Sequence, residues 1–357
     1  MKHFFDQFPP PEFLQMSFFG LDITPKAVRV AELKRKGGHY VLGRYGERML
    51  KTPVSSAEEL SSSDELKKAL QSLQREFKIE FVKVAISEEE AYLFKTDVET
   101  GTEEQVRTAI EFHLEENVPI SGEETVFDYH IFRQKDHTHA EASVTVLPRK
   151  IIDQYITLLH ECDLVPLSFL LESAALSRSL IKAGDMNAYL LVNLEETKTS
   201  ISIVSDGAVQ FSSTAAVGSD SFIASIAKEF QVSEEEAAKI KNEKGFMKEE
   251  QNESVFAALA NTVSILNDEI ERIYLYWHSH KDAEGQTGKK IEKIILAGKD
   301  TALAGFKDHL SQSLRIPVEI GNVWTNTASF DVHIPSMSQV DSLNYAAPIG
   351  LAIPKFS

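Results

Sequence analysis

The sequence predicts an α/β protein with two similar lobes, because one strand pattern occurs twice along the chain. Phe18–Leu33 and Tyr189–Val204 each read as an apolar strand, a polar stretch rich in Thr and Lys, and a second, alternating strand. Asp22 lies at the exit of the first strand in one copy, and Asn193 lies there in the other. A strand–turn–strand with a carboxylate at this place suits a Mg²⁺–nucleotide. Two copies therefore predict two lobes that face each other across a cleft.

The composition is that of an ordinary soluble protein. A length of 357 residues favours two or three domains. The net charge of −17 argues against nonspecific binding to nucleic acid or to anionic lipid. The single cysteine, Cys162, excludes an intramolecular disulfide. No apolar run is long enough for a transmembrane helix, and residues 1–16 lack the apolar core of a signal peptide, so we predict a cytoplasmic protein.

The elements of the first lobe follow from periodicity and turn residues. Strands are predicted at 18–23, 27–34 and 39–49, with Gly37–Gly38 as the second turn. The helix at 64–77 has leucines spaced three and four residues apart, and a strand follows at 81–86. A strand at 165–170 and a helix at 172–183 then return the chain to this lobe.

Between these parts lies a segment with its own order of elements. A strand at 93–98, a helix at 103–116 capped by Thr102, strands at 125–132 and 141–147 and a helix at 149–162 give β-α-β-β-α. We predict a subdomain inserted into the first lobe.

The second lobe repeats the first meander at 189–194, 199–205 and 208–215, with Asp206–Gly207 as a hairpin turn. The remaining predicted elements are helices at 219–230, 233–242, 253–280 and 302–314, strands at 293–297 and 317–320, and a closing helix at 344–353.

Several segments resemble a known family, in the same order along the chain: GLDITPKAVRVAEL, EEQVRTAIEFHLEENVPISGEETVFDYHIF, VGSDSFIASIAKEFQVSEEEAAKIK and YAAPIGLAI. The resemblance is to the actin-like ATPase superfamily and, within it, to the PilM family of bacterial type IV pilus assembly, over nearly the whole chain. It implies an actin-like (ribonuclease H-like) duplicated fold with an SHS2-like inserted subdomain. The implied divisions are an N-terminal arm (1–16), a first lobe (17–92 and 164–186), an inserted partner-binding subdomain (93–163), a second lobe (187–225 and 285–357) and a helical subdomain (226–284).

The resemblance also implies ATP with Mg²⁺ as a cofactor. The residues that match the family's site are, in the first phosphate loop, Asp22 (also the metal position), Thr24 and Lys26; in the second, Asn193, Glu195, Thr197 and Thr199; beside the nucleoside, Gly218; near the adenine, Glu269 and Arg272; and in the adenosine loop, Gly298 and Lys299.

Four residues depart from the family's pattern. Asn193 replaces a carboxylate and Glu195 replaces a glycine, while Ser219 and Lys299 each replace the second glycine of a pair. Glu195 adds negative charge where a triphosphate would lie, and one like-charge contact costs on the order of 1 kcal/mol in water and more where it is partly buried. We therefore expect no enzyme activity, and either weak nucleotide binding or none.

In the family, the groove between the inserted subdomain and the first lobe receives the N-terminal tail of a membrane-anchored PilN-like partner. By resemblance, Val106, Ile110, Phe112 and His113 could line that groove, or they could pack on the subdomain's own sheet. The resemblance implies a cytoplasmic scaffold of the pilus platform, held at the inner membrane through its partners, with self-association left open. The alternatives are an active actin-like ATPase or kinase, and an FtsA-like division protein. The Phe- and Pro-rich arm either packs on its own domain or contacts a partner or membrane.

Overall fold

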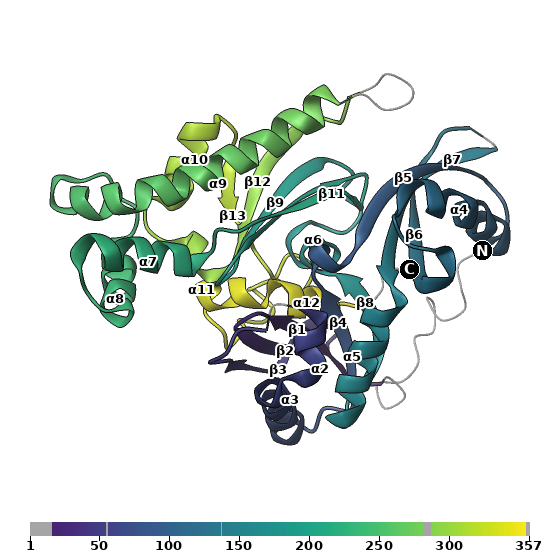
Figure 1. The fold of residues 1–357 in the computed structure, drawn as a ribbon, viewed down its shortest axis with the longest axis horizontal. Coiled ribbons are helices and arrows are strands. Elements are labelled where there is room, and N and C mark those ends of the chain that lie inside the picture. Colours follow the sequence, from purple (N-terminus) through teal and green to yellow (C-terminus); the bar gives the residue numbers. More distant parts are fainter. Residues whose placement is uncertain (1–15, 55, 137, 281–286, 355–357) are drawn as a thin grey trace.

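The computed structural model describes residues 16–54, 56–136, 138–280 and 287–354. The predicted N-terminal arm lies outside the described residues, apart from Met16. The strands form two five-stranded sheets and one three-stranded sheet (Figure 1).

The first lobe is built on a sheet of order β3-β2-β1-β4-β8. Its first three strands form an antiparallel meander, and β4 and β8 continue the sheet in parallel with β1. One face is covered by α3 and α5, whose leucines join the strand residues in one core. The elements are β1 (Phe18–Thr24), β2 (Ala27–Lys36), β3 (His39–Met49), α2 (Ala57–Ser62), α3 (Asp64–Phe77), β4 (Phe81–Ile86), α5 (Arg149–Glu161), β8 (Val165–Leu171) and α6 (Glu172–Leu180).

The second lobe repeats this topology, with the order β11-β10-β9-β12-β13. The antiparallel meander and the parallel continuation occur in the same places, which confirms the predicted duplication. The elements are β9 (Ala188–Leu194), β10 (Thr199–Ser205), β11 (Ala208–Ala215), α7 (Ser219–Phe230), α8 (Glu234–Lys244), α9 (Glu253–Ser279), β12 (Ile291–Ala297), α10 (Phe306–Leu314), β13 (Val318–Ile320), α11 (Gln339–Ser342) and α12 (Ala346–Ala352).

One predicted helix, at 302–314, is shorter than expected. Residues Lys299–Ala302 form a short 3-10 turn, and α10 begins only at Phe306. Gly305 has φ 81°, a left-handed backbone that cannot continue a right-handed helix. Apolar periodicity does not show this interruption.

The inserted subdomain has an antiparallel sheet of order β5-β7-β6, with α4 on one face. Helix α5 completes the predicted β-α-β-β-α order, but its buried Leu158 and Leu159 join the core of the first lobe. The subdomain's own core is therefore made by α4 and the three strands. Figure 1 shows it beside the first lobe. The elements are β5 (Tyr92–Glu99), α4 (Glu103–Asn117), β6 (Thr125–Gln134) and β7 (His139–Pro148).

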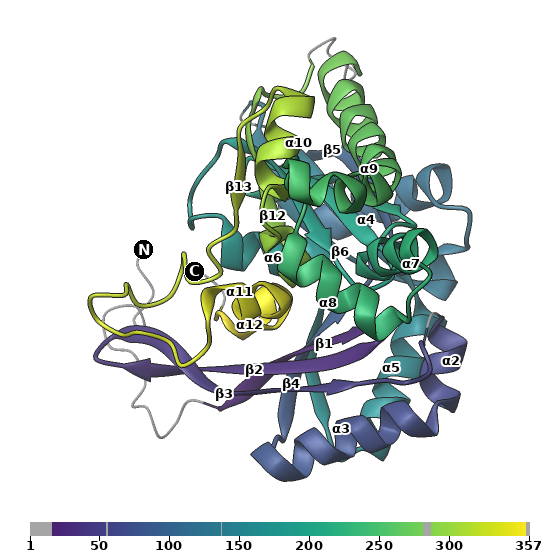
Figure 2. The ribbon, with the colours of Figure 1, turned by 90° about the vertical axis from the view of Figure 1, so that its left-hand side faces the viewer.

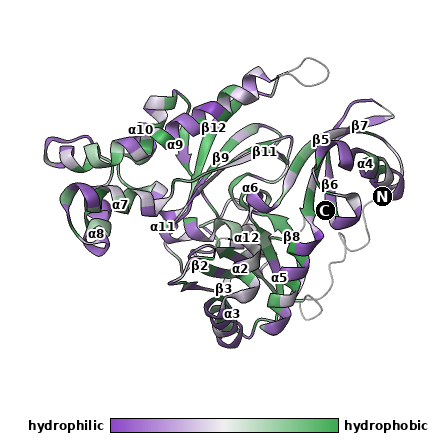
Figure 3. Cartoon of the chain, in the orientation of Figure 1, coloured by the Kyte–Doolittle hydropathy of each residue, from purple (hydrophilic) through white to green (hydrophobic). Residues whose placement is uncertain are grey.

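Helix α12 packs between the lobes (Figure 2). A Cβ on Gly20 of β1 would lie 1.9 Å from the Pro348 carbonyl oxygen, and one on Gly350 would lie 1.8 Å from the Ala175 carbonyl oxygen. These glycines allow α12 to approach β1 and α6 closely. Hydrophobic residues concentrate in the strands of the two large sheets, whereas outer helices such as α3 and α8 are largely hydrophilic (Figure 3). No helix in the described part of the chain is long and apolar enough to cross a membrane.

Candidate functional site

The two repeated strand–turn segments meet between the lobes, as the duplication predicts. Asp22 of β1 and Asn193 of β9 line one small cavity together with Glu195, Glu196 and Gly298. Its volume is about 10 Å³, which is at the lower limit for one water molecule. Pockets that bury small-molecule ligands are typically about 300–1,000 Å³. In this arrangement the residues do not leave room for a nucleoside triphosphate.

Glu196 of the second phosphate loop lines this cavity and binds the first lobe. The buried Arg29 guanidinium donates from Nη2 to the Glu196 carboxylate and from Nε to Glu47 Oε1 at 2.6 Å. Thr24 Oγ1 lies 3.4 Å from the other Glu196 oxygen. Burial acts to lower the pKa of Arg29, but the carboxylates of Glu196, Glu47 and Asp22 outweigh it and raise that pKa. A protein carboxylate thus contacts the first phosphate loop.

Two further ion pairs connect the lobes. Lys26 Nζ, in the turn after β1, lies 2.5 Å from Asp220 Oδ2 on α7. Lys198 Nζ, in the turn after β9, lies 2.8 Å from Glu89 Oε2 and donates to Ser87 Oγ at 2.7 Å. Both lysines could otherwise serve phosphates, and here they are bound to residues of the opposite lobe.

Asn193 contacts a buried carboxylate that the sequence reasoning did not find. Its side-chain Nδ2 donates to Glu172 Oε1, which also accepts from Ser200 Oγ at 3.2 Å. An aspartate at 193 would place a second carboxylate at hydrogen-bonding distance from Glu172. The amide removes that repulsion and supplies a donor, so Asn193 and Glu172 are chemically matched.

Other carboxyl groups around this contact have raised pKa values. Burial, followed by the charge of Glu172, raises the pKa of Asp22 to about 7, while Arg29 acts to lower it. Burial and the same Glu172 charge raise the pKa of Glu88 to about 7, against a hydrogen bond of 2.7 Å from the Ser173 amide. Burial likewise raises the pKa of Glu195 well above its usual range. The cleft is therefore an acidic, poorly hydrated environment.

Gly218 and Gly298, which the resemblance places beside the nucleoside, lie where the backbone is tight or left-handed, and Lys299 binds another side chain. A Cβ on Gly218 would lie 2.5 Å from the Glu196 carbonyl oxygen, and Gly298 has φ 87°. Lys299 Nζ pairs with Asp341 Oδ1 at 2.6 Å.

The other predicted nucleotide residues serve local contacts. Arg272 donates to Glu269, both on α9, with an Nε–Oε2 distance of 3.0 Å, and neither lines the cavity. Thr199 Oγ1 donates to the Val217 carbonyl at 2.6 Å, and Thr197 lies in the turn between β9 and β10.

A second unpredicted cluster lies beside Gly218. The buried Lys241 of α8 forms an ion pair with Asp300 and donates to Ser219 Oγ at 2.9 Å. Ser219 also donates to Asp300. Ser219, one of the residues that departs from the family's glycine pairs, thus has a structural partner.

No group of three or more His, Cys, Asp or Glu side chains is arranged to hold a metal ion within the described ranges. Asp22 lies opposite Arg29 on the neighbouring strand and near the carboxyl groups of Glu172 and Glu196. Its role as a metal position remains a prediction.

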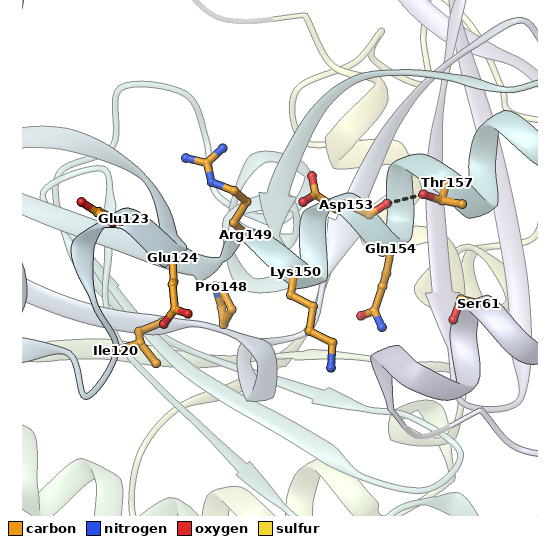
Figure 4. Close-up of a pocket in the computed structure, with 10 residues that line it drawn as sticks. All are labelled: Ser61, Ile120, Glu123, Glu124, Pro148, Arg149, Lys150, Asp153, Gln154 and Thr157. Carbon is orange, nitrogen blue, oxygen red and sulfur yellow. Dashed lines mark hydrogen bonds between the residues drawn. The ribbon is translucent and has the colours of Figure 1, made fainter.

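A larger opening lies between the inserted subdomain and the first lobe, with a volume of about 630 Å³ (Figure 4). We call it the tail groove. Lys150 and Gln154 extend from α5 into the space between Ser61 of α2 and Glu124 (Figure 4). Its lining residues are Ser61, Ile120, Glu123, Glu124, Pro148, Arg149, Lys150, Asp153, Gln154 and Thr157.

The four partner-binding residues predicted on α4 do not line this groove. Val106 and Ile110 face the subdomain's core and are 2% and 0% exposed, which matches the alternative of packing on its own sheet. Phe112 lies on the outer face of α4 at 78% exposure, and His113 is half-exposed near Glu116. Val106 and Ile110 are four residues apart and share the buried face of α4, whereas Phe112 and His113 lie outside that face.

Known proteins match this chain both in family and in fold. The model of the family described as type IV pilus assembly protein PilM matches residues 20–356. A search of curated proteins finds no match. The chain is similar to a solved PilM–PilN type IV pilus biogenesis complex, with TM-score 0.73, 18% identity, and coverage of 96% of this chain and 98% of that one.

Two other solved structures share the actin-like fold. They are the ethanolamine utilization protein EutJ from Carboxydothermus hydrogenoformans (TM-score 0.52, 11% identity, 96% and 91% coverage) and MreB5 of Spiroplasma citri bound to ADP (TM-score 0.50, 14% identity, 88% and 94% coverage).

Proposed function

The chain belongs to the PilM family of type IV pilus assembly proteins, and from that membership we propose that it is a scaffold that binds the N-terminal tail of a PilN-like membrane protein. The likeness to a PilM–PilN complex supports this partner. The proposed place is the cytoplasmic side of the inner membrane, where the partner and other platform proteins would hold it. Self-association belongs to the same proposal.

The observation that carries the proposal is the tail groove. It is large enough for several side chains of an extended peptide, and it lies between the inserted subdomain and the first lobe. Glu123, Glu124 and Asp153 offer carboxylates to Lys or Arg side chains of a tail, and Arg149 and Lys150 offer cations to its acidic groups. Ile120 and Pro148 offer apolar contact between them. A short peptide with apolar residues and charges of both signs, basic ones in excess, would match this lining.

Point variants test the groove better than removal of residues 93–163, because that deletion would take Leu158 and Leu159 out of the first lobe's core. Calorimetry with a synthetic peptide of the partner's N-terminal tail would measure affinity. We expect Gln154→Trp, which fills the groove, to weaken binding on the order of 100-fold, and Glu124→Lys roughly ten-fold. Leu275→Ser, which changes a residue 55% exposed on α9 and away from the groove, is the control. Unchanged affinity of folded Gln154→Trp would reject the site.

We further propose that nucleotide binding is weak or absent and that hydrolysis is negligible. The Arg29–Glu196 contact and the pairs made by Lys26 and Lys198 support this, because a triphosphate would have to displace them. Calorimetry with Mg-ATP should give little heat for the parent chain. A variant with Asn193→Asp, Glu195→Gly and Glu196→Ala should bind more tightly. Tight binding and phosphate release by the parent would favour the alternative of an active ATPase.

A further inference from the structure

The β2–β3 hairpin and the loop at 329–336 form one surface at an edge of the first lobe. The Ala328 amide donates to the Tyr40 carbonyl at 2.8 Å, so the loop starts directly beside the hairpin. The two segments lie together at the left of Figure 2. We define the tip patch as Lys34, Arg35, Lys36, His39, Phe330, Val332 and Ile334.

The loop exposes apolar side chains at alternate positions. Phe330, Val332 and Ile334 are 51%, 56% and 77% exposed. Ala328 and Met337, at the two ends of the loop, are buried, and Met337 belongs to the core that joins the lobes. The loop therefore presents its large apolar residues to solvent from a fixed base, although burying them inward would be favourable.

The hairpin supplies positive charge beside these residues. Lys34 and Lys36 are exposed and Arg35 is partly exposed, in a chain of net charge −17. Lys34 Nζ lies 3.6 Å from Glu32 Oε2, but Arg44 already binds that carboxylate with an Nη2–Oε1 distance of 2.8 Å. Asp331 is the acidic residue within the loop. The tip patch is thus locally basic on an acidic molecule.

We propose that the tip patch contacts the surface of an anionic lipid bilayer directly. The apolar side chains enter the boundary between headgroups and acyl chains, and the basic side chains bind lipid phosphates. The net charge of −17 that opposes nonspecific lipid binding also orients the molecule. It repels the rest of the molecule from the bilayer, so the tip patch is the part that approaches. The proposal is independent of the tail groove, which lies on other elements.

An acidic protein partner would be the competing occupant. The three exposed apolar residues alternate along a single loop, and basic residues of the hairpin lie beside them. Insertion into lipid needs no complementary shape. The charge and the loop together therefore favour the bilayer.

Vesicle co-sedimentation of the full chain tests the proposal. Vesicles of phosphatidylethanolamine and phosphatidylglycerol should bind the parent chain, whereas vesicles of phosphatidylcholine should bind it much less. Raising the salt from about 0.1 M to about 0.5 M should release most of the protein, since exposed charges are then screened. Lys34→Gln with Lys36→Gln should weaken binding roughly 25-fold, at about five-fold for each basic residue.

Phe330→Ser with Ile334→Ser should weaken binding roughly ten-fold or more. The matched controls are Ile265→Ser, an apolar residue 57% exposed on α9, and Lys68→Gln on α3, and both should bind as the parent does. Thermal unfolding checks that each variant is folded. Absence of parental binding to the anionic vesicles, or equal binding by the tip variants, would overturn the proposal. If the tip variants bound the vesicles as the parent does but lost binding to an acidic protein partner, the tip patch would be a protein contact.

Discussion

Replacing Asp22 by asparagine should stabilise the protein at neutral and alkaline pH but not at acidic pH. Asp22 is 7% exposed, and burial and the Glu172 charge raise its pKa from 3.8 to about 7. Between these two values the folded chain keeps a proton that the unfolded chain has lost. The stability present below about pH 4 is therefore lost progressively as the pH rises to about 7.

The size of the effect follows from the two pKa values. The difference between 3.8 and about 7 corresponds to about 4 kcal/mol of unfolding free energy once both states are ionised. An asparagine side chain at this position would have the same shape and no charge to bury. We expect Asp22→Asn to exceed the parent by about 4 kcal/mol at pH 8, by about 2 kcal/mol near pH 5.5, and to equal it near pH 4.

Urea unfolding at these three pH values, followed by circular dichroism and by tryptophan fluorescence, measures the difference. Two probes are needed because a chain with several domains need not unfold in one step. Asp268→Asn, which changes an exposed carboxylate on α9, should show no such dependence. A variant that is less stable than the parent at pH 8 would refute the reasoning. It would mean that Arg29 stabilises an ionised Asp22 more than burial penalises it.

Two further predictions concern packing and charge between the lobes. Arg29→Met leaves the Glu196 carboxylate without its cation and should lower the unfolding free energy by about 3 kcal/mol. Adding Glu196→Gln should recover part of that loss in urea unfolding, and strictly additive losses would contradict the pair. Gly20→Ala would place a methyl group 1.9 Å from the Pro348 carbonyl oxygen, so it should cost roughly 3 kcal/mol in thermal unfolding. Gly122→Ala should have little effect, because the added Cβ would meet no other part of the chain within 4 Å. Equal melting temperatures of the two variants would argue against close packing of α12 on β1.

Most of the fold could be predicted because its signals are local. The repeated meander gives alternating strands and turn residues in both lobes, and both sheets have the topology that follows from this repeat. The failures are also local in origin. Apolar spacing continues through Gly305, whose positive φ interrupts the helix, and the spacing within α5 cannot tell which sheet its leucines pack against.

The site was predicted in part. The duplication indicated that Asp22 and Asn193 would face each other, and they line one cavity. Glu88 and Glu172 were missed because no motif or spacing marks a carboxylate that becomes buried only when the lobes pack. On α4, the same apolar spacing that suggested a partner surface is explained by core packing of Val106 and Ile110.

Two residues of the second phosphate loop, the substituted Asn193 and its near neighbour Glu196, bind the first lobe in the folded protein. Asn193 donates to Glu172, and Glu196 binds Arg29. A single lost carboxylate could weaken metal binding and leave the cleft open. Here Asn193 and Glu196 bind residues of the first lobe, so protein side chains occupy part of the space between the two phosphate loops. Restoring one family residue should then be unfavourable, since Asn193→Asp alone would put its carboxylate against Glu172. We expect tighter nucleotide binding only when Asn193→Asp is combined with Glu195→Gly and Glu196→Ala, which remove two other carboxylates from the cavity lining.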